Sequence, residues 1–94
     1  MTSQTFNTED YLKTPEDIAE YLNAALEDGN ERLLLTALQT VAKATGGMSV
    51  LAKHSQLNRE SLYRALSKNG NPRLDTLAAI LKTYGLRLSV LPLH

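Results

Sequence analysis

The sequence contains no cysteine, and it has no run of about 18 consecutive apolar residues, the length that a membrane-spanning helix needs. The absence of cysteine excludes disulfide bonds and thiolate metal ligands, and it suits a reducing compartment. The N-terminal segment lacks the basic flank and apolar run of a secretory signal. We therefore expect a cytoplasmic protein with no membrane partner.

Residues that could form a catalytic or metal site are also scarce. The two histidines, His54 and His94, lie far apart in the sequence, and no serine has a histidine and an acid as evident partners. Glu16 and Glu20 lie one helical turn apart, which is more typical of a solvated helix face than of acid–base chemistry. The sequence predicts no enzymatic activity, no metal and no cofactor.

The net charge is zero, but the charges are sorted along the chain. Residues 1–47 carry three basic and eight acidic side chains, a net charge of −5, whereas residues 48–73 carry five basic and one acidic side chain, a net charge of +4. The length and the apolar content of 43% favour a single domain over residues 1–94. The basic segment suits a polyanion, and the acidic segment suits a basic protein.

Capping residues and apolar periodicity predict three helices outside the central segment, after an extended N-terminal arm over residues 1–13. Two N-terminal helices are expected within residues 15–45, starting after Thr14 and at Asn30 and ending at glycines. A final helix is expected over residues 74–84. Arg73 is a poor capping residue there, so either that helix starts less cleanly or Arg73 contacts phosphate. The apolar stripes include Leu26, Leu33 and Leu74, which we expect to face the core.

Residues 48–67 have the pattern of a helix-turn-helix, with two short helices joined by a tight turn. Ala52 supplies the small residue where the helices touch. Apolar contacts come from Leu51, Leu57, Leu62 and Leu66. Asn58 is expected to cap the second helix, whose N-terminus carries a partial positive charge that favours phosphate.

The second helix has polar side chains opposite its leucines, and these suit the edges of DNA bases. Arginine pairs with the two acceptors of guanine, glutamate accepts from cytosine, and Asn58 could pair with adenine if it is not fully engaged as the cap. The alternative is that this is merely the solvated face of a surface helix. The candidate DNA-binding residues are Ser49, Asn58, Arg59, Glu60, Ser61, Tyr63, Arg64, Lys68, Asn69 and Arg73.

The C-terminal segment changes period. Leu86, Leu88 and Val90 alternate with other residues over 86–91, which predicts a short β-strand, and the economical partner is the same strand of a second copy. The alternative is a tail that lays its leucines on the core. The expected fold is therefore all-α, with five helices and a short C-terminal β-strand paired across a homodimer, so that two helices read half-sites about 34 Å apart.

Several of these segments resemble one known family. Tyr11-Leu12, residues 15–22 and residues 59–67 (RESLYRALS) are similar to the probable addiction-module antidote proteins, HigA-like antitoxins with a Cro/repressor-type helix-turn-helix. The resemblance implies neutralisation of a co-encoded RelE/ParE-like toxin and repression of the shared operon through its double-stranded operator. Gln56 departs from the pattern because glycine is common there, so its backbone must become left-handed or reach the turn differently. Asn58 stands where serine is common.

Two questions of function stay open at the level of sequence. The acidic N-terminal half, with Phe6, Tyr11 and Leu12 as apolar anchors, is a reasonable surface for a basic toxin. The alternative is that these side chains fold back on the first two helices, which we favour for Leu12. The protein could also be an orphan helix-turn-helix regulator, or a protein-interaction module that does not bind DNA. Salt-dependent DNA binding distinguishes a DNA-binding protein from such a module.

Overall fold

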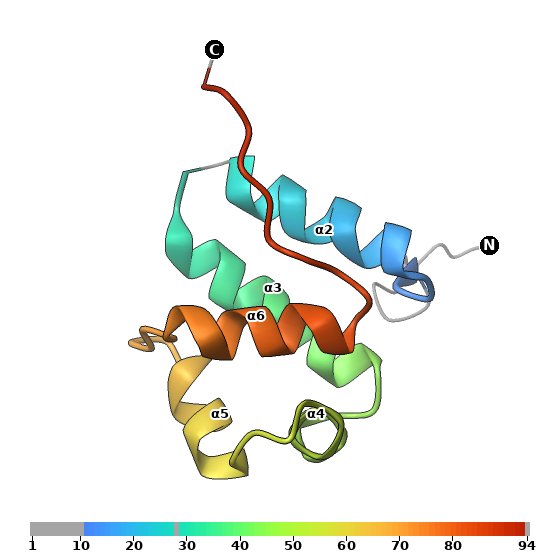
Figure 1. Ribbon diagram of the computed structural model, residues 1–94, viewed down its shortest axis with the longest axis vertical. Helices are drawn as coiled ribbons and strands as arrows, with labels where there is room; N and C mark the ends of the chain where they lie inside the picture. The colour runs from blue at the N-terminus through green and yellow to red at the C-terminus, as the bar shows by residue number, and fades with distance from the viewer. Residues whose placement is uncertain (1–10, 28, 94) are drawn as a thin grey trace, which may run out of the picture.

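In the computed structural model of the chain, residues 11–27 and 29–93 are described, and they form five helices and no β-strand (Figure 1). The described helices are α2 (Pro15–Glu27), α3 (Glu31–Ala44), α4 (Met48–Ser55), α5 (Arg59–Ala65) and α6 (Leu74–Thr83). The expectation of an all-α fold with five helices is therefore confirmed. Phe6 and most of the predicted N-terminal arm lie outside the described residues.

Local capping sets where the first two of these helices begin. The Thr14 hydroxyl accepts a hydrogen bond from the Asp17 N–H at 3.0 Å, and the Asp17 carboxylate accepts one from the Thr14 N–H at 3.3 Å. This reciprocal pair satisfies backbone donors that the helix itself cannot use. At the start of α3, the Asn30 side chain accepts from the Arg32 N–H at 3.0 Å. Both starts lie where the sequence predicts them.

Helix α3 lies between α2 and the remaining helices and supplies the centre of the core (Figure 1). Leu38 and Val41 of this helix are completely buried. Leu62 and Leu66 at α5 and Ile80 of α6 are equally buried in the same cluster. The expected role of the α5 leucines is confirmed, and burial of each such side chain stabilises the fold by about 1.5–3 kcal/mol.

Three leucines that were expected to face the core are exposed. Leu26 is 50% exposed, Leu33 37% and Leu74 70%. Leu26 lies in the last turn of α2, and Leu33 and Leu74 lie in the first turns of α3 and α6. Ala42 and Leu81, in the last turns of α3 and α6, are nevertheless buried, so the apolar period alone does not show where the core ends.

The predicted β-strand over 86–91 is wrong. Gly85 adopts a left-handed φ of 78°, and the Leu86 N–H donates to the Leu81 carbonyl at 2.8 Å, which ends α6 as expected for a glycine terminator. Beyond this point the chain runs toward the end of the molecule that carries α2 (Figure 1). A strand is defined by hydrogen bonds to a neighbouring extended backbone. The expected neighbour was the same segment of a second copy, and no described segment of this chain takes its place.

Most of the apolar side chains of this C-terminal tail do not lie on the core. Leu86 is partly buried against it, but Leu88 is 46% exposed and Val90 is 95% exposed. The alternative of a tail that lays its leucines on the core therefore holds for Leu86 alone. The alternation of apolar residues over 86–91 therefore does not lead to a sheet in this chain, and the segment is a tail without regular secondary structure.

Tyr84, the residue that ends α6, places a hydroxyl group in the core. The residue is 9% exposed. Its hydroxyl oxygen lies near Thr45 but makes no well-aligned hydrogen bond among the described residues. Burial raises the pKa of Tyr84, and the contact with Thr45 lowers it by less. The folded protein therefore holds the proton of this phenol more tightly than the unfolded chain does.

This difference predicts a loss of stability in alkali. A tyrosine whose pKa is raised by folding contributes its full stability below the unfolded pKa of about 10, and that contribution is lost as the pH rises above it. Tyr84→Phe has no proton to lose, so its free energy of unfolding should fall less steeply above pH 10 than that of the wild type. Urea unfolding between about pH 7 and 11 measures this. Identical pH profiles for the two proteins would contradict it.

Candidate nucleic-acid interface

Helices α4 and α5 are joined by residues 56–58, and the turn depends on an unusual backbone at Gln56. This residue adopts φ 63° and ψ 24°, the left-handed conformation, and it is the one described residue other than glycine with a positive φ. Of the two routes that the sequence left open at this position, the chain takes the strained one. Leu51 is buried in the core, and Ala52 and Leu57 are partly buried against it, so apolar contacts with the core hold the turn in place.

Asn58 caps α5 as the sequence predicts. Its side-chain oxygen accepts a hydrogen bond from the Ser61 N–H at 3.0 Å, and its own backbone is extended. Pairing with adenine requires the same oxygen as an acceptor for the base amino group. The cap therefore competes with adenine reading, and in this structure the cap holds the oxygen.

The buried leucines determine which side chains of α5 face outward. With Leu62 and Leu66 in the core, Glu60, Ser61 and Arg64 lie on the outer side of the helix, and all three are exposed. Arg59 stacks on the ring of Tyr63, with the guanidinium carbon 5.6 Å from the ring centre. Such a contact is worth about 0.5–1 kcal/mol at an exposed site, and it restricts the Arg59 side chain at the N-terminus of α5.

The loop after α5 adds further candidates beside this outer side. Ser61, Arg64, Asn69 and Arg73 all line one open hollow of about 470 Å³. Arg73 precedes α6 without a side-chain capping bond, and its guanidinium forms an exposed ion pair with Asp75 at 3.3 Å. An exposed pair of this kind contributes little energy, so the guanidinium stays available to a phosphate.

Other predicted residues lie elsewhere. Tyr63 lines a separate hollow of about 290 Å³ together with residues of α3 and α4, among them Gln39 and Met48. Ser49 is exposed in the first turn of α4, and Lys68 lines a third hollow against α3. The structure thus groups four of the candidates around one hollow, and Tyr63 and Lys68 line two others.

The close approach of the loop to α5 requires a glycine. A Cβ at Gly70 would lie 2.6 Å from the carbonyl carbon of Ala65 and 2.7 Å from the carbonyl oxygen of Arg64. Both atoms belong to the backbone and cannot move aside cheaply. Gly70 therefore lets the loop lie against the end of α5, where Asn69 and Arg73 line the same hollow as Arg64.

Two residues of α3 that hold this region were not among the sequence candidates. The Gln39 side-chain amide donates to the carbonyl of Leu66, and the Arg32 guanidinium donates to the carbonyl of Lys68. Arg32 and Gln39 are seven residues apart and so lie on one face of α3. The sequence shows that the two side chains share a face of α3, but it does not show their partners. Lys68 is 36 residues from Arg32, and Leu66 is 27 residues from Gln39.

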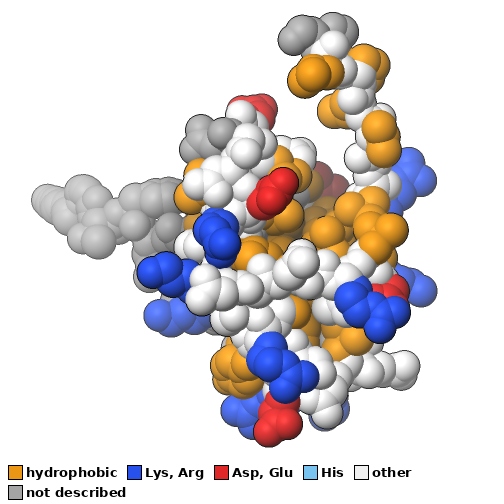
Figure 2. Space-filling view, turned by 90° about the vertical axis from the view of Figure 1, so that its left-hand side faces the viewer, with side chains coloured by type: hydrophobic (Ala, Val, Ile, Leu, Met, Phe, Trp, Pro, Cys, Tyr) orange, Lys and Arg blue, Asp and Glu red, His pale blue; other side chains and the backbone are white. Residues whose placement is uncertain are grey.

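Basic side chains are present at the end of the molecule that carries α4 and α5, but they are not confined to it. Figure 2 shows Lys and Arg side chains at the lower end, at mid-height on both edges and beside the tail, and apolar side chains over the middle and along the tail. No group of acidic or histidine side chains within the described ranges is placed to hold a metal ion. Among the described helices, none has the length and apolar character needed to cross a membrane.

The fold and this surface define a small all-helical protein with a basic two-helix unit at one end. A sequence profile of the family described as "Probable addiction module antidote protein" matches residues 2–92, and the chain belongs to this family. It is also 38% identical to an uncharacterized protein of Haemophilus influenzae over 92 residues, which cover 96% of this chain and 94% of that protein. No solved structure matches the chain.

The left-handed backbone of Gln56 predicts that glycine is better at this position. A side chain in this conformation costs about 1–2 kcal/mol, which exceeds the entropy that glycine adds to the unfolded chain. Gln56→Gly should raise the free energy of unfolding by about 0.5–1 kcal/mol in urea titrations. The matched control is His54→Gly, two residues earlier in the last turn of α4, which should lose about 0.3 kcal/mol, the difference in helix propensity between histidine and glycine. Equal losses in both variants would show that Gln56 carries no strain.

Proposed function

We propose that this protein is the antitoxin of a type II toxin–antitoxin module, and that it also represses its own operon by binding operator DNA through α4 and α5 as a helix-turn-helix. The family name supports the first half, since an addiction-module antidote neutralises a toxin encoded with it. The second half rests on α5. We propose a homodimer, in which two copies of this helix read half-sites about 34 Å apart.

One observation carries the DNA-binding proposal: the polar side chains on the outer side of α5 are exposed to solvent. Glu60, Ser61 and Arg64 are exposed there, next to a capped helix N-terminus that favours phosphate. A buried surface at this place would have excluded groove binding. Arg64 suits guanine, Glu60 suits cytosine, and Lys68 at the loop suits the phosphate backbone.

The proposed toxin is a small basic protein of the RelE/ParE-like type, and the acidic N-terminal half is the surface that suits it. Tyr11 is half-buried, and its hydroxyl donates to the carboxylate of Glu20 on α2. This hydrogen bond, together with the nearby negative charge, raises the pKa of Tyr11 to about 12. Tyr11 is thus engaged with α2, and Leu12 beside it is buried in the core, so Phe6 is the better candidate for an apolar anchor.

The roles proposed for the basic residues predict different losses on different DNA. Arg59→Ala or Arg64→Ala should cost about 1–3 kcal/mol on the duplex upstream of the protein's own reading frame and should relax base preference. Lys68→Ala should weaken that duplex and a random duplex about equally, because phosphate contacts carry no sequence information. Lys13→Ala, just before α2, removes the same charge outside the basic unit and is the control. Fluorescence anisotropy at several salt concentrations measures all four.

Two results would contradict these assignments. Equal losses for all three variants on both duplexes would remove the base-reading role of Arg59 and Arg64. If the DNA affinity of the wild type does not fall as the salt concentration rises, the protein does not bind DNA through phosphate contacts. The protein-interaction module that the sequence left open would then be the better function.

The proposed toxin contact makes a separate prediction. Phe6→Ala should weaken capture of the co-encoded toxin by about 1–2 kcal/mol, the usual cost of removing an aromatic anchor. Binding to DNA should not change, because the proposed base and phosphate contacts lie on α5 and the loop that follows it. Asn23→Ala, an exposed polar position on α2, is the control. Isothermal titration with purified toxin measures the affinity, and an unchanged value for Phe6→Ala would remove this residue from the contact.

A further inference from the structure

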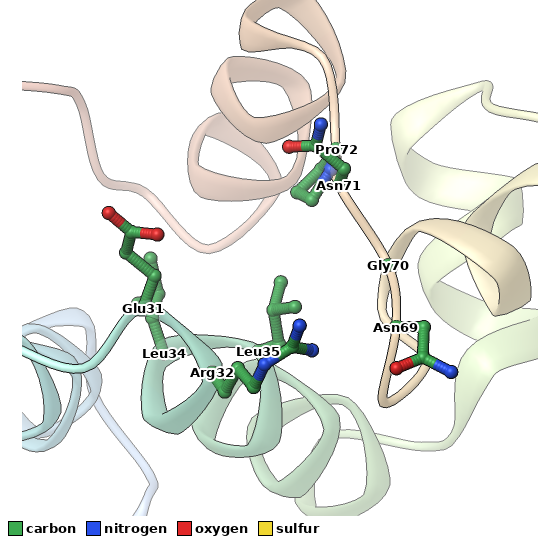
Figure 3. Close-up of a pocket in the computed structure, with 8 residues that line it drawn as sticks. All are labelled: Glu31, Arg32, Leu34, Leu35, Asn69, Gly70, Asn71 and Pro72. Atoms are coloured by element: carbon green, nitrogen blue, oxygen red, sulfur yellow. The ribbon is translucent and has the colours of Figure 1, made fainter.

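A cleft of about 410 Å³ separates α3 from the end of α5 and the loop that follows it. Arg32, Thr36 and Gln39 line it from α3, and Leu66 and Lys68 line it from the other side. Figure 3 shows the neighbouring pocket, where the guanidinium of Arg32 points from α3 toward the loop of residues 69–72. The cleft is therefore crossed by side chains that start on α3.

Helix α5 is too short to fix its own direction. It has seven residues, about two turns, and helices of that length are unstable in water without tertiary contacts. The last carbonyls of a helix also lack partners within it. The direction of α5, and with it the aim of Arg64, must therefore come from contacts with the rest of the chain.

Two such contacts are polar and come from a single rigid element. Gln39 donates to the carbonyl of Leu66 directly after α5, and Arg32 donates to the carbonyl of Lys68 in the loop. Helix α3 is fixed by Leu38, which is completely buried. A hydrogen bond is directional, whereas apolar packing tolerates small rotations, so these two bonds restrict the end of α5 in a way that its leucines do not.

We infer that Gln39 and Arg32 are positioning residues for DNA reading: Gln39 holds α5 at the angle that its base contacts need, and Arg32 holds the loop that presents Lys68 to phosphate. This inference rests on the proposed DNA binding. It assigns to α3 a part in specificity although neither side chain lies on the outer side of α5. Gln39 acts on the reading of sequence, and Arg32 acts on affinity for any sequence.

The test compares Gln39→Met, which keeps the size of the side chain but removes the donor, with Thr36→Ala. Thr36 lines the same cleft and forms no hydrogen bond across it among the described contacts, so it is the matched control. Gln39→Met should lower affinity for the upstream duplex about tenfold and change affinity for a random duplex less than twofold. Thr36→Ala should change neither. Thermal unfolding of each variant checks that the fold is retained.

The Arg32 variants test the second part. Arg32→Met should weaken both duplexes by the same factor, about threefold, and Arg32→Lys should restore most of that loss because it keeps the charge and a donor. A loss confined to the upstream duplex would assign Arg32 to base reading and overturn its proposed role. If Arg32→Lys does not restore binding, the hydrogen bond from residue 32 to the Lys68 carbonyl does not support affinity, and the proposed role of Arg32 is overturned as well.

Amide hydrogen exchange tests Gln39 without DNA. Gln39→Met should speed exchange of the Leu66 and Ser67 amides several-fold and leave the α6 amides unchanged, while Thr36→Ala should leave both unchanged. Unchanged exchange at α5, or equal losses on both duplexes, would overturn the inference. If the wild type shows no preference for the upstream duplex, the proposed function fails, and the exchange rates alone decide whether Gln39 holds α5.

Discussion

Burial of apolar side chains against α3 is the interaction on which the rest of the structure depends. The other described helices have seven to thirteen residues, and such helices are marginal on their own. Leu38 and Val41 of α3 are completely buried, and they share one cluster with Leu62 of α5 and Ile80 of α6. The position of the candidate DNA contacts on α5 thus follows from how Leu62 and Leu66 pack in this cluster, and a change in that packing would move the contacts together.

The arrangement of charge gives this small protein two chemically different ends. Helix α2, with Glu16, Asp17 and Glu20, lies on one side of α3, and the basic unit of α4 and α5 lies on the other (Figure 1). A basic protein and a nucleic acid would therefore approach different elements, with α3 between them. Helix α3 also carries Arg32 and Gln39, whose side chains donate to the loop and to the end of α5.

Sequence reasoning succeeded wherever the physical cause lies within one helical turn. The caps at Thr14 and Asn58 and the glycine that ends α6 are all local, because each depends on backbone groups three to five residues away. At Gln56 the sequence left two routes open, and the structure takes the left-handed one. The same reasoning failed for Leu26, Leu33 and Leu74, since periodicity shows which face of a helix is apolar but not how far the core extends along it. The tail failed for a related reason: alternation describes a backbone that is ready to pair, and pairing needs a partner.

The order of residues by itself determined that this chain is helical, where its turns fall, and that arginines gather on one short segment, because steric limits and capping act between near neighbours. Only the tertiary structure decided which of those polar residues share a surface: it grouped Arg64 with Asn69 and Arg73, moved Tyr63 to another hollow, and brought Gln39 to the end of α5. Contacts between residues about 30 positions apart depend on how the helices pack, and that packing is a property of the whole core that no short stretch of sequence contains.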